Sequence, residues 1–154
     1  LLLLNISNVL MLGDSGAYLL GFFIGLIIIS SHMKNPDVSP YFFISLIWYP
    51  CFENLFSIIR KLNREFSPLK PDSKHLHQLV FFLLTKKFDL KLIHSNNLSS
   101  GIICFFNFLI IYISSLNPSS TIFQIKLIAT SIIFYNVSYI VLFKFYKSDL
   151  ISKK

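Results

Sequence analysis

Residues 11–29, MLGDSGAYLLGFFIGLIII, open with a short polar turn and continue as a long apolar run. A bilayer core about 30 Å thick needs about 20 helical residues, so a run of 18 or more with few charges indicates a transmembrane helix. Three later runs share this character. We therefore predict an all-α, polytopic membrane helix bundle with about four transmembrane helices, over residues 15–31, 41–59, 101–116 and 122–143.

The composition agrees with a membrane protein, because 54% of the 154 residues are hydrophobic and 17 are Phe. The net charge of +7 comes from bases that gather in two regions, residues 60–100 and the tail after residue 143. The positive-inside rule makes both regions cytoplasmic. The even number of spans between them fits that assignment. We expect the lipid bilayer, and no nucleic acid, as the partner of these charges, and we place the start of the first span in the cytoplasm.

The long cytoplasmic loop, residues 60–100, contains two different pieces. The piece LVFFLLTKKFDLKLIH (79–94) mixes apolar residues with lysines, and we expect it to lie in the membrane interface or to cap the bundle as an amphipathic helix. The piece NREFSPLKPDSKH (63–75) carries two prolines and is typical of an irregular loop. Because the chain opens on LLLLNISNVL without an initiator Met, we interpret residues 1–154 as a single membrane domain, the C-terminal part of a larger protein.

Asp14 is a carboxylate at the edge of the first apolar run. A helix that begins there carries Gly21 and Gly25 on the same face as Asp14. These glycines form a G-x-x-x-G pair, which lets membrane helices approach closely, so we expect this face to contact other helices. A carboxylate at the cytoplasmic mouth of a bundle can bind Mg²⁺ together with substrate phosphates. The alternative is that Asp14 or Ser15 caps the helix N-terminus.

Glu53 is a second ionisable residue within a predicted span, and Arg60 lies two turns further along the same face, about 10.5 Å away along the axis. Intramembrane carboxylates usually face a bundle interior or a cavity and are candidates for functional sites. The alternative is a buried carboxylate whose hydrogen bonds are satisfied by a neighbouring helix.

The stretch PDSKHLHQL (71–79) places His75 and His77 two residues apart. Their side chains share a side if the backbone is extended and diverge if it is helical. No third or fourth ligand stands at a spacing usual for Zn²⁺. The pair could donate hydrogen bonds to phosphate oxygens beside Lys74. The alternative is a solvated polar loop.

Together, GDSGAYLLG (13–21) before a span and SPLKPDSKHLHQL (67–79) after the next one resemble the bacterial polyprenyl-phosphate N-acetylhexosamine-1-phosphate transferases. This family is related to phospho-N-acetylmuramoyl-pentapeptide transferase. The resemblance covers about residues 5–80, and the last two spans match in topology only. It implies an enzyme that transfers a sugar-1-phosphate from a UDP-sugar to polyprenyl (undecaprenyl) phosphate, in the first membrane step of cell-envelope polysaccharide synthesis, such as cell wall or lipopolysaccharide.

The same resemblance implies a multi-pass protein of the bacterial inner membrane, with a homodimer as a possible assembly. It implies that Asp14 binds Mg²⁺, with Mn²⁺ as a substitute, and that His75 and His77 are catalytic and contact the nucleotide diphosphate. The substrate-binding residues that it implies are Gly13, Ser15, Gly16, Arg60, Lys74 and Gln78.

The chain departs from the family pattern at several positions. Gln78 stands where many members have a further His, Glu53 stands where an Asp is common, and Ala17 replaces a frequent Ser. The paired-aspartate motif of the family's N-terminal half is absent, since the chain has no Asp-Asp pair. We therefore expect the chain by itself to be inactive.

Two further hypotheses remain open at this point. The chain could be a non-catalytic remnant or partner subunit that keeps the fold of the family. It could also be a small transporter with Glu53 as the coupling carboxylate. A transporter is expected to carry ionisable groups near the midplane of several spans, and only Glu53 offers one.

Overall fold

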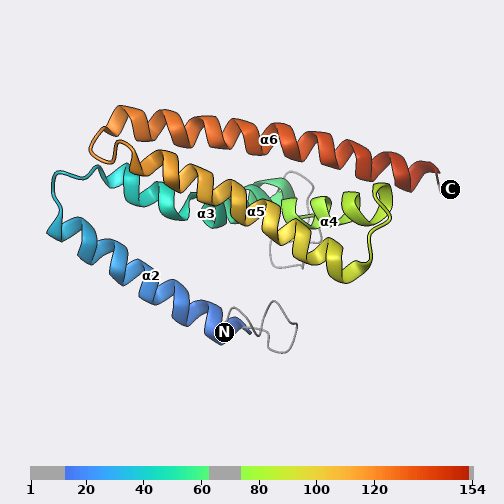
Figure 1. The fold of residues 1–154 in the computed structure, drawn as a ribbon, viewed down its shortest axis with the longest axis horizontal. Helices are drawn as coiled ribbons and strands as arrows, with labels where there is room; N and C mark the ends of the chain where they lie inside the picture. Colours follow the sequence, from blue (N-terminus) through green and yellow to red (C-terminus); the bar gives the residue numbers. More distant parts are fainter. Residues whose placement is uncertain (1–12, 63–73, 153–154) are drawn as a thin grey trace.

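A computed structural model describes residues 13–62 and 74–152, except for the side chains of Asp14 and of residues 150–152. The described residues contain helices and no strand, which confirms the predicted all-α class (Figure 1). The predicted helix end before residue 13, and most of the predicted loop 63–75, lie outside the described residues. The helices are α2 (Asp14–Lys34), α3 (Pro40–Leu62), α4 (Leu76–Lys87), α5 (Leu92–Ser115) and α6 (Thr121–Ser152).

Four of these helices, α2, α3, α5 and α6, are long and apolar enough to cross a membrane, as predicted. All four extend beyond their predicted bounds, and the largest differences are in two of them, because α5 begins at Leu92 rather than at 101 and α6 continues to Ser152 rather than 143. Hydropathy marks only the apolar centre of a helix. Polar residues such as Ser95 and Ser99 lower the hydropathy without breaking the helix, and here both are buried.

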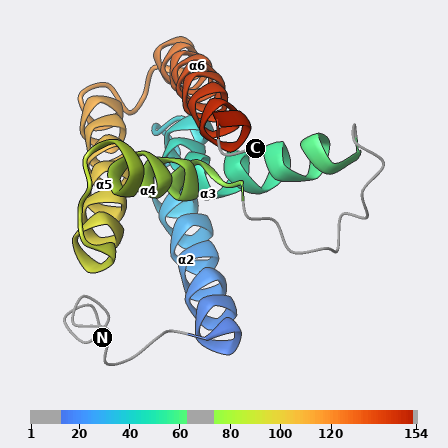
Figure 2. The same ribbon diagram turned by 90° about the vertical axis from the view of Figure 1, so that its right-hand side faces the viewer.

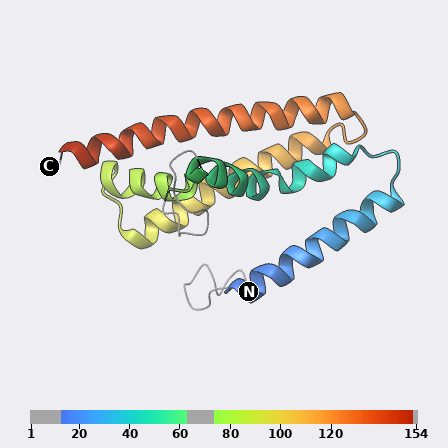
Figure 3. The same ribbon diagram turned by 180° about the vertical axis from the view of Figure 1, so that it is seen from behind.

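The helix ends are arranged as the charge distribution predicted. The connection between α2 and α3 and the connection between α5 and α6 lie at one end of the molecule, and α4 and the end of α6 lie toward the other (Figures 1 and 3). At the first end, the Ser39 amide donates to the Pro118 carbonyl at 3.0 Å, and the Ser39 and Thr121 hydroxyls are 3.0 Å apart. The two basic regions therefore share one end, which is the predicted cytoplasmic one.

Helix α3 bends sharply partway along its length (Figure 2). Pro50 lies in its interior. A proline inside a helix removes one backbone hydrogen bond and its ring clashes with the carbonyl four residues earlier, which kinks the helix. The second half of α3, which carries Glu53 and Arg60, therefore runs in a different direction from the first half.

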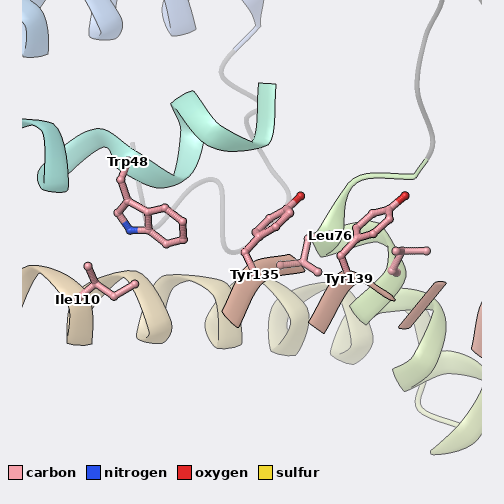
Figure 4. Close-up of a cluster of buried hydrophobic side chains, with 6 residues drawn as sticks. Trp48, Leu76, Ile110, Tyr135 and Tyr139 are labelled. Atoms are coloured by element: carbon pink, nitrogen blue, oxygen red, sulfur yellow. The ribbon is translucent and has the colours of Figure 1, made fainter. Parts of the chain in front are cut away.

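The core lies where α3, α4, α5 and α6 meet. Trp48 of α3 and Ile110 of α5 are buried there together with Tyr135 and Tyr139 of α6 (Figure 4). Helix α4 contributes Leu76 and packs against both α5 and α6. This packing agrees with the expected helix that caps the bundle, and the expected position in the membrane interface stays a prediction.

The predicted continuous piece 79–94 is interrupted. Helix α4 ends at Lys87, Asp89 takes a φ of 50°, and α5 begins at Leu92. A non-glycine residue with this left-handed φ cannot continue a right-handed helix, so the chain turns back at this point.

Helix α2 lies apart from the other helices over most of its length (Figures 1 and 2). A Cβ atom added to Gly21 or Gly25 would meet no atom within 4 Å. The predicted close approach of this glycine face to another helix is therefore not observed in the described part of the chain. The reason is that α2 diverges from α3 toward its N-terminal end, and its ring contact with α3 is made at the opposite end, between His32 and Phe43.

Candidate functional site

The carboxylate of Glu53 lies at the junction of α3, α4 and α6, with 9% of its side chain exposed. Its Oε1 accepts hydrogen bonds from the Leu76 amide at 3.1 Å and lies 2.9 Å from Nδ1 of His75. Its Oε2 accepts a hydrogen bond from the Tyr135 hydroxyl at 2.8 Å. A buried carboxylate is tolerated only when such partners compensate it. The alternative that neighbouring helices satisfy Glu53 is thus confirmed.

His75 precedes the first residue of α4 and occupies its N-cap position with an extended backbone. The Gln78 side-chain oxygen accepts a hydrogen bond from the His75 amide at 3.1 Å, as in a capping box. The ring of His77, in the first turn of α4, lies nearly parallel to that of His75, with centroids 5.7 Å apart and planes at 9°. The extended backbone at His75 therefore places both rings on one side of the chain, as expected for an extended backbone and not for a helical one.

The two histidines have different environments. His75 contacts the Glu53 carboxylate, whereas His77 is exposed. Partial loss of solvent around the ring and then the neighbouring His75 lower the pKa of His77 below its ordinary value of 6.5, and Glu53 opposes the shift. His77 is therefore mainly neutral at pH 7, so it acts as a hydrogen-bonding group rather than as a cation.

Arg60 connects the bent half of α3 to the chain that enters α4. Its Nη1 donates to the Lys74 carbonyl at 2.8 Å and to the Tyr139 hydroxyl at 2.6 Å. Its guanidinium also lies over the rings of Phe56 and Tyr139, at 5.6 Å and 5.2 Å from their centroids. These contacts hold Lys74, the residue before His75, against α3 and α6.

The predicted site residues therefore fall into two groups. One group comes together at the start of α4, and its members are Arg60, Lys74, His75, His77 and Gln78. The other group lies at the start of α2, which stands apart from α4 in Figures 1 and 2, and its members are Gly13, Asp14, Ser15 and Gly16.

At the start of α2, Gly13 holds the N-cap position. Glycine has no side chain to cap the helix, and Ser15 is already one residue inside it, so the predicted cap by Asp14 or Ser15 is not observed at that position. The Asp14 side chain itself lies outside the described residues. Its predicted metal role therefore stays a prediction.

Within the described residues, no three His, Cys, Asp or Glu side chains gather closely enough to hold a metal ion. Glu53, the carboxylate beside the histidines, already accepts hydrogen bonds from two donors and contacts a third group. A Mg²⁺ site can be built with fewer than three such side chains, since one or two carboxylates together with substrate phosphates are sufficient.

An apolar groove of about 560 Å³ lies between α4, α5 and α6. Its walls include Ile102 and Phe106 of α5 and Val137 of α6. Leu76 and Tyr135 line the groove and also donate the two hydrogen bonds to Glu53. The groove therefore extends from the membrane-spanning helices to the residues that hold Glu53.

Sequence reasoning identified Glu53 and the two histidines separately but missed their direct contact and the role of Tyr135. The available signal was weak. Tyr135 and Tyr139 recur four residues apart in the last span, which places two hydroxyl groups on one helix face. Such a pair on a helix in a bundle indicates a polar partner, but it does not identify that partner as Glu53.

The chain is similar to two curated proteins, the undecaprenyl-phosphate alpha-N-acetylglucosaminyl 1-phosphate transferases of Salmonella typhi and of Salmonella typhimurium. Each is 33% identical over 70 residues, which are 45% of this chain and 19% of the relative. The match thus spans about a fifth of the length of these relatives. No family model and no solved structure matches the chain. This similarity supports a relation to the transferase family that the motifs resemble. Together with the four long apolar helices, it also supports a multi-pass membrane protein.

Proposed function

We propose that this chain forms part of a membrane enzyme that transfers a sugar-1-phosphate from a UDP-sugar to polyprenyl phosphate and releases UMP. The observation that supports this most is the pair of parallel histidine rings at the start of α4, one of them held by a buried carboxylate, beside an apolar groove between membrane-spanning helices. Such a site can receive a charged diphosphate from the cytoplasm and a hydrocarbon chain from the bilayer.

In the proposed reaction, an oxygen of the lipid phosphate attacks the phosphorus that carries the sugar, and the bond from this phosphorus to the UMP oxygen breaks. The protein performs little covalent chemistry in such a transfer and contributes mainly positioning and charge stabilisation. His77 and Lys74 supply N–H donors for the diphosphate oxygens, and His75 supplies a further donor from Nε2 when its ring is charged. Arg60 and Gln78 hold the backbone from which these donors project.

Magnesium, or manganese in its place, would be held by Asp14 and would neutralise charge on the diphosphate when bound. This role requires the start of α2 to lie closer to α4 than it does in Figures 1 and 2. The fit rests on donor chemistry, because a carboxylate at the cytoplasmic end of a span offers the oxygen ligand that Mg²⁺ prefers. Further ligands are expected from parts of the enzyme that correspond to the remaining length of the relatives. We propose the bacterial inner membrane and cell-envelope polysaccharide synthesis as the setting, and a homodimer as one possible assembly.

The transporter hypothesis is less well supported. A coupling carboxylate must exchange its proton or ion during each cycle. Glu53 is instead buried and bound by groups from α4 and α6, which fix its position. We therefore assign Glu53 to the structure of the transferase site.

The groove predicts a specific effect on the lipid acceptor. Val137→Trp places a bulky ring in the groove between α5 and α6. We expect the KM for polyprenyl phosphate to rise about tenfold, as a loss of about 1.4 kcal/mol of binding would produce, while the KM for the UDP-sugar stays unchanged. Steady-state kinetics with each substrate varied in turn measures this.

A matched control is available on the same helix. Ile140 is 53% exposed and Val137 is 56% exposed, but Ile140 does not line the groove. Ile140→Trp should therefore leave both KM values near those of the unmodified enzyme. An equal rise in the lipid KM for both variants would show that the groove does not hold the acceptor chain.

A further inference from the structure

We propose that Glu53 is a positioning residue, which fixes the His75 ring with its proton on Nδ1 and leaves Nε2 as the ring nitrogen that faces the substrate. This inference rests on the proposed transferase function and deepens it. Glu53 does not touch the reacting groups in this account. It acts through His75.

The contact between the two side chains determines the form of the ring. Nδ1 of His75 lies 2.9 Å from Oε1 of Glu53. An ionised carboxylate only accepts hydrogen bonds, so Nδ1 must carry the hydrogen. The hydrogen bond of one ring nitrogen sets the state of the other. In the neutral ring Nε2 therefore accepts a hydrogen bond, and in the charged ring it donates one to a phosphate oxygen.

Glu53 is itself held rigidly, which makes it suitable for this role. The Leu76 amide and the Tyr135 hydroxyl donate to its two oxygens from α4 and α6. A freely rotating surface carboxylate could not fix a partner ring, whereas a buried one with two further donors can. The carboxylate oxygen that contacts the ring also binds the first amide of α4, so the ring and the helix are placed as one unit.

The two histidines are consequently not equivalent. His75 has a carboxylate partner that sets its proton, whereas His77 lies parallel to His75 and has no such partner among the described residues. When the carboxylate partner of a metal-bound histidine is removed, metal affinity or activity typically falls by about 10-fold to 100-fold. We expect a loss of the same order when Glu53 is changed.

Nuclear magnetic resonance tests the geometry independently of activity. The complete protein, labelled with ¹⁵N in its histidines and placed in detergent micelles, should show His75 with a protonated Nδ1 near neutral pH. The His75→Gln variant assigns the signal. A bare Nδ1 with the proton on Nε2 would overturn the proposal, because the carboxylate could not then accept from the ring.

A kinetic cycle tests the role. Glu53→Gln keeps the size and one acceptor oxygen for the Leu76 amide, so the fold should persist. We expect kcat to fall about 10-fold to 100-fold with little change in the KM for the UDP-sugar. In the His75→Gln background, Glu53→Gln should cause no further loss. Losses that multiply in the double variant would contradict action through His75.

Asp37→Asn is the matched control, because Asp37 is an exposed carboxylate in the connection between α2 and α3. It should leave kcat and the His75 signal unchanged. A protein with the Nδ1–H ring but without any sugar-phosphate transfer would contradict the proposed function while leaving the positioning of His75 by Glu53 intact. The two failures are thereby distinguished.

Discussion

Asp14→Asn in the complete protein is expected to abolish Mg²⁺-dependent release of UMP from a UDP-sugar. Asparagine keeps the size of the side chain but removes the charge that would hold the ion. Loss of the metal's charge stabilisation is worth several kcal/mol, and about 4 kcal/mol corresponds to about a 1,000-fold lower rate. The measurement is UMP release by membranes that contain polyprenyl phosphate, at a series of Mg²⁺ concentrations.

Two comparisons make this experiment specific for Asp14. Asp37→Asn removes an equivalent charge from an exposed connection and should turn over normally. If Asp14 holds the ion, higher Mg²⁺ should restore part of the Asp14→Asn activity. Normal turnover by a well-expressed Asp14→Asn protein would disprove the metal role.

Arg60→Ala should have the largest effect on stability. It removes hydrogen bonds to the Lys74 carbonyl and the Tyr139 hydroxyl and the contact with the Phe56 ring. Hydrogen bonds from a charged group contribute about 1.5–3 kcal/mol each, so we expect the free energy of unfolding to fall by about 2–4 kcal/mol. Reversible unfolding in bicelles measures this change. Activity should fall with it, because Lys74, the residue before His75, is no longer held.

The matched variants separate the contributions of Arg60. Arg60→Lys keeps the charge but lacks the planar guanidinium that lies over the Phe56 and Tyr139 rings, so it should recover only part of the stability. Tyr139→Phe keeps the ring below the guanidinium and removes one acceptor, so its loss should be smaller than that of Arg60→Ala. Lys86→Ala, at the exposed end of α4, should have no effect. An Arg60→Ala protein as stable as the unmodified one would contradict the structural role of Arg60.

Hydropathy and charge predicted the fold well because both are properties of contiguous stretches of sequence and do not depend on contacts between distant residues. A long apolar run must be helical in a bilayer, since every backbone group must be paired within it. The charge distribution also predicted that the α2–α3 and α5–α6 connections lie at one end of the bundle, and the contacts of Ser39 with Pro118 and Thr121 confirm this. The membrane side of that end stays a prediction. From the sequence, the side chains of His75 and His77 are expected to share a side if the backbone there is extended. His75 has an extended backbone and the two rings lie side by side.

The remaining features depend on groups that are distant in the sequence. Pro50 indicates that α3 can kink, but the direction of the bend depends on the packing of α3 against α5 and α6. Glu53 and Tyr135 are 82 residues apart, so their hydrogen bond follows from the fold and not from spacing. Gly21 and Gly25 indicate a face suited to close packing without specifying that a partner is present in the described chain.

The most direct test of the central claim follows the two phosphates of the donor. The complete protein in liposomes with polyprenyl phosphate is given a UDP-sugar labelled on the phosphate next to the sugar. We predict that the label moves to the lipid and that one UMP is released for each transfer. Release of UDP with an unlabelled lipid would indicate transfer of the sugar alone, and that result, or no transfer at all, would contradict the proposed function.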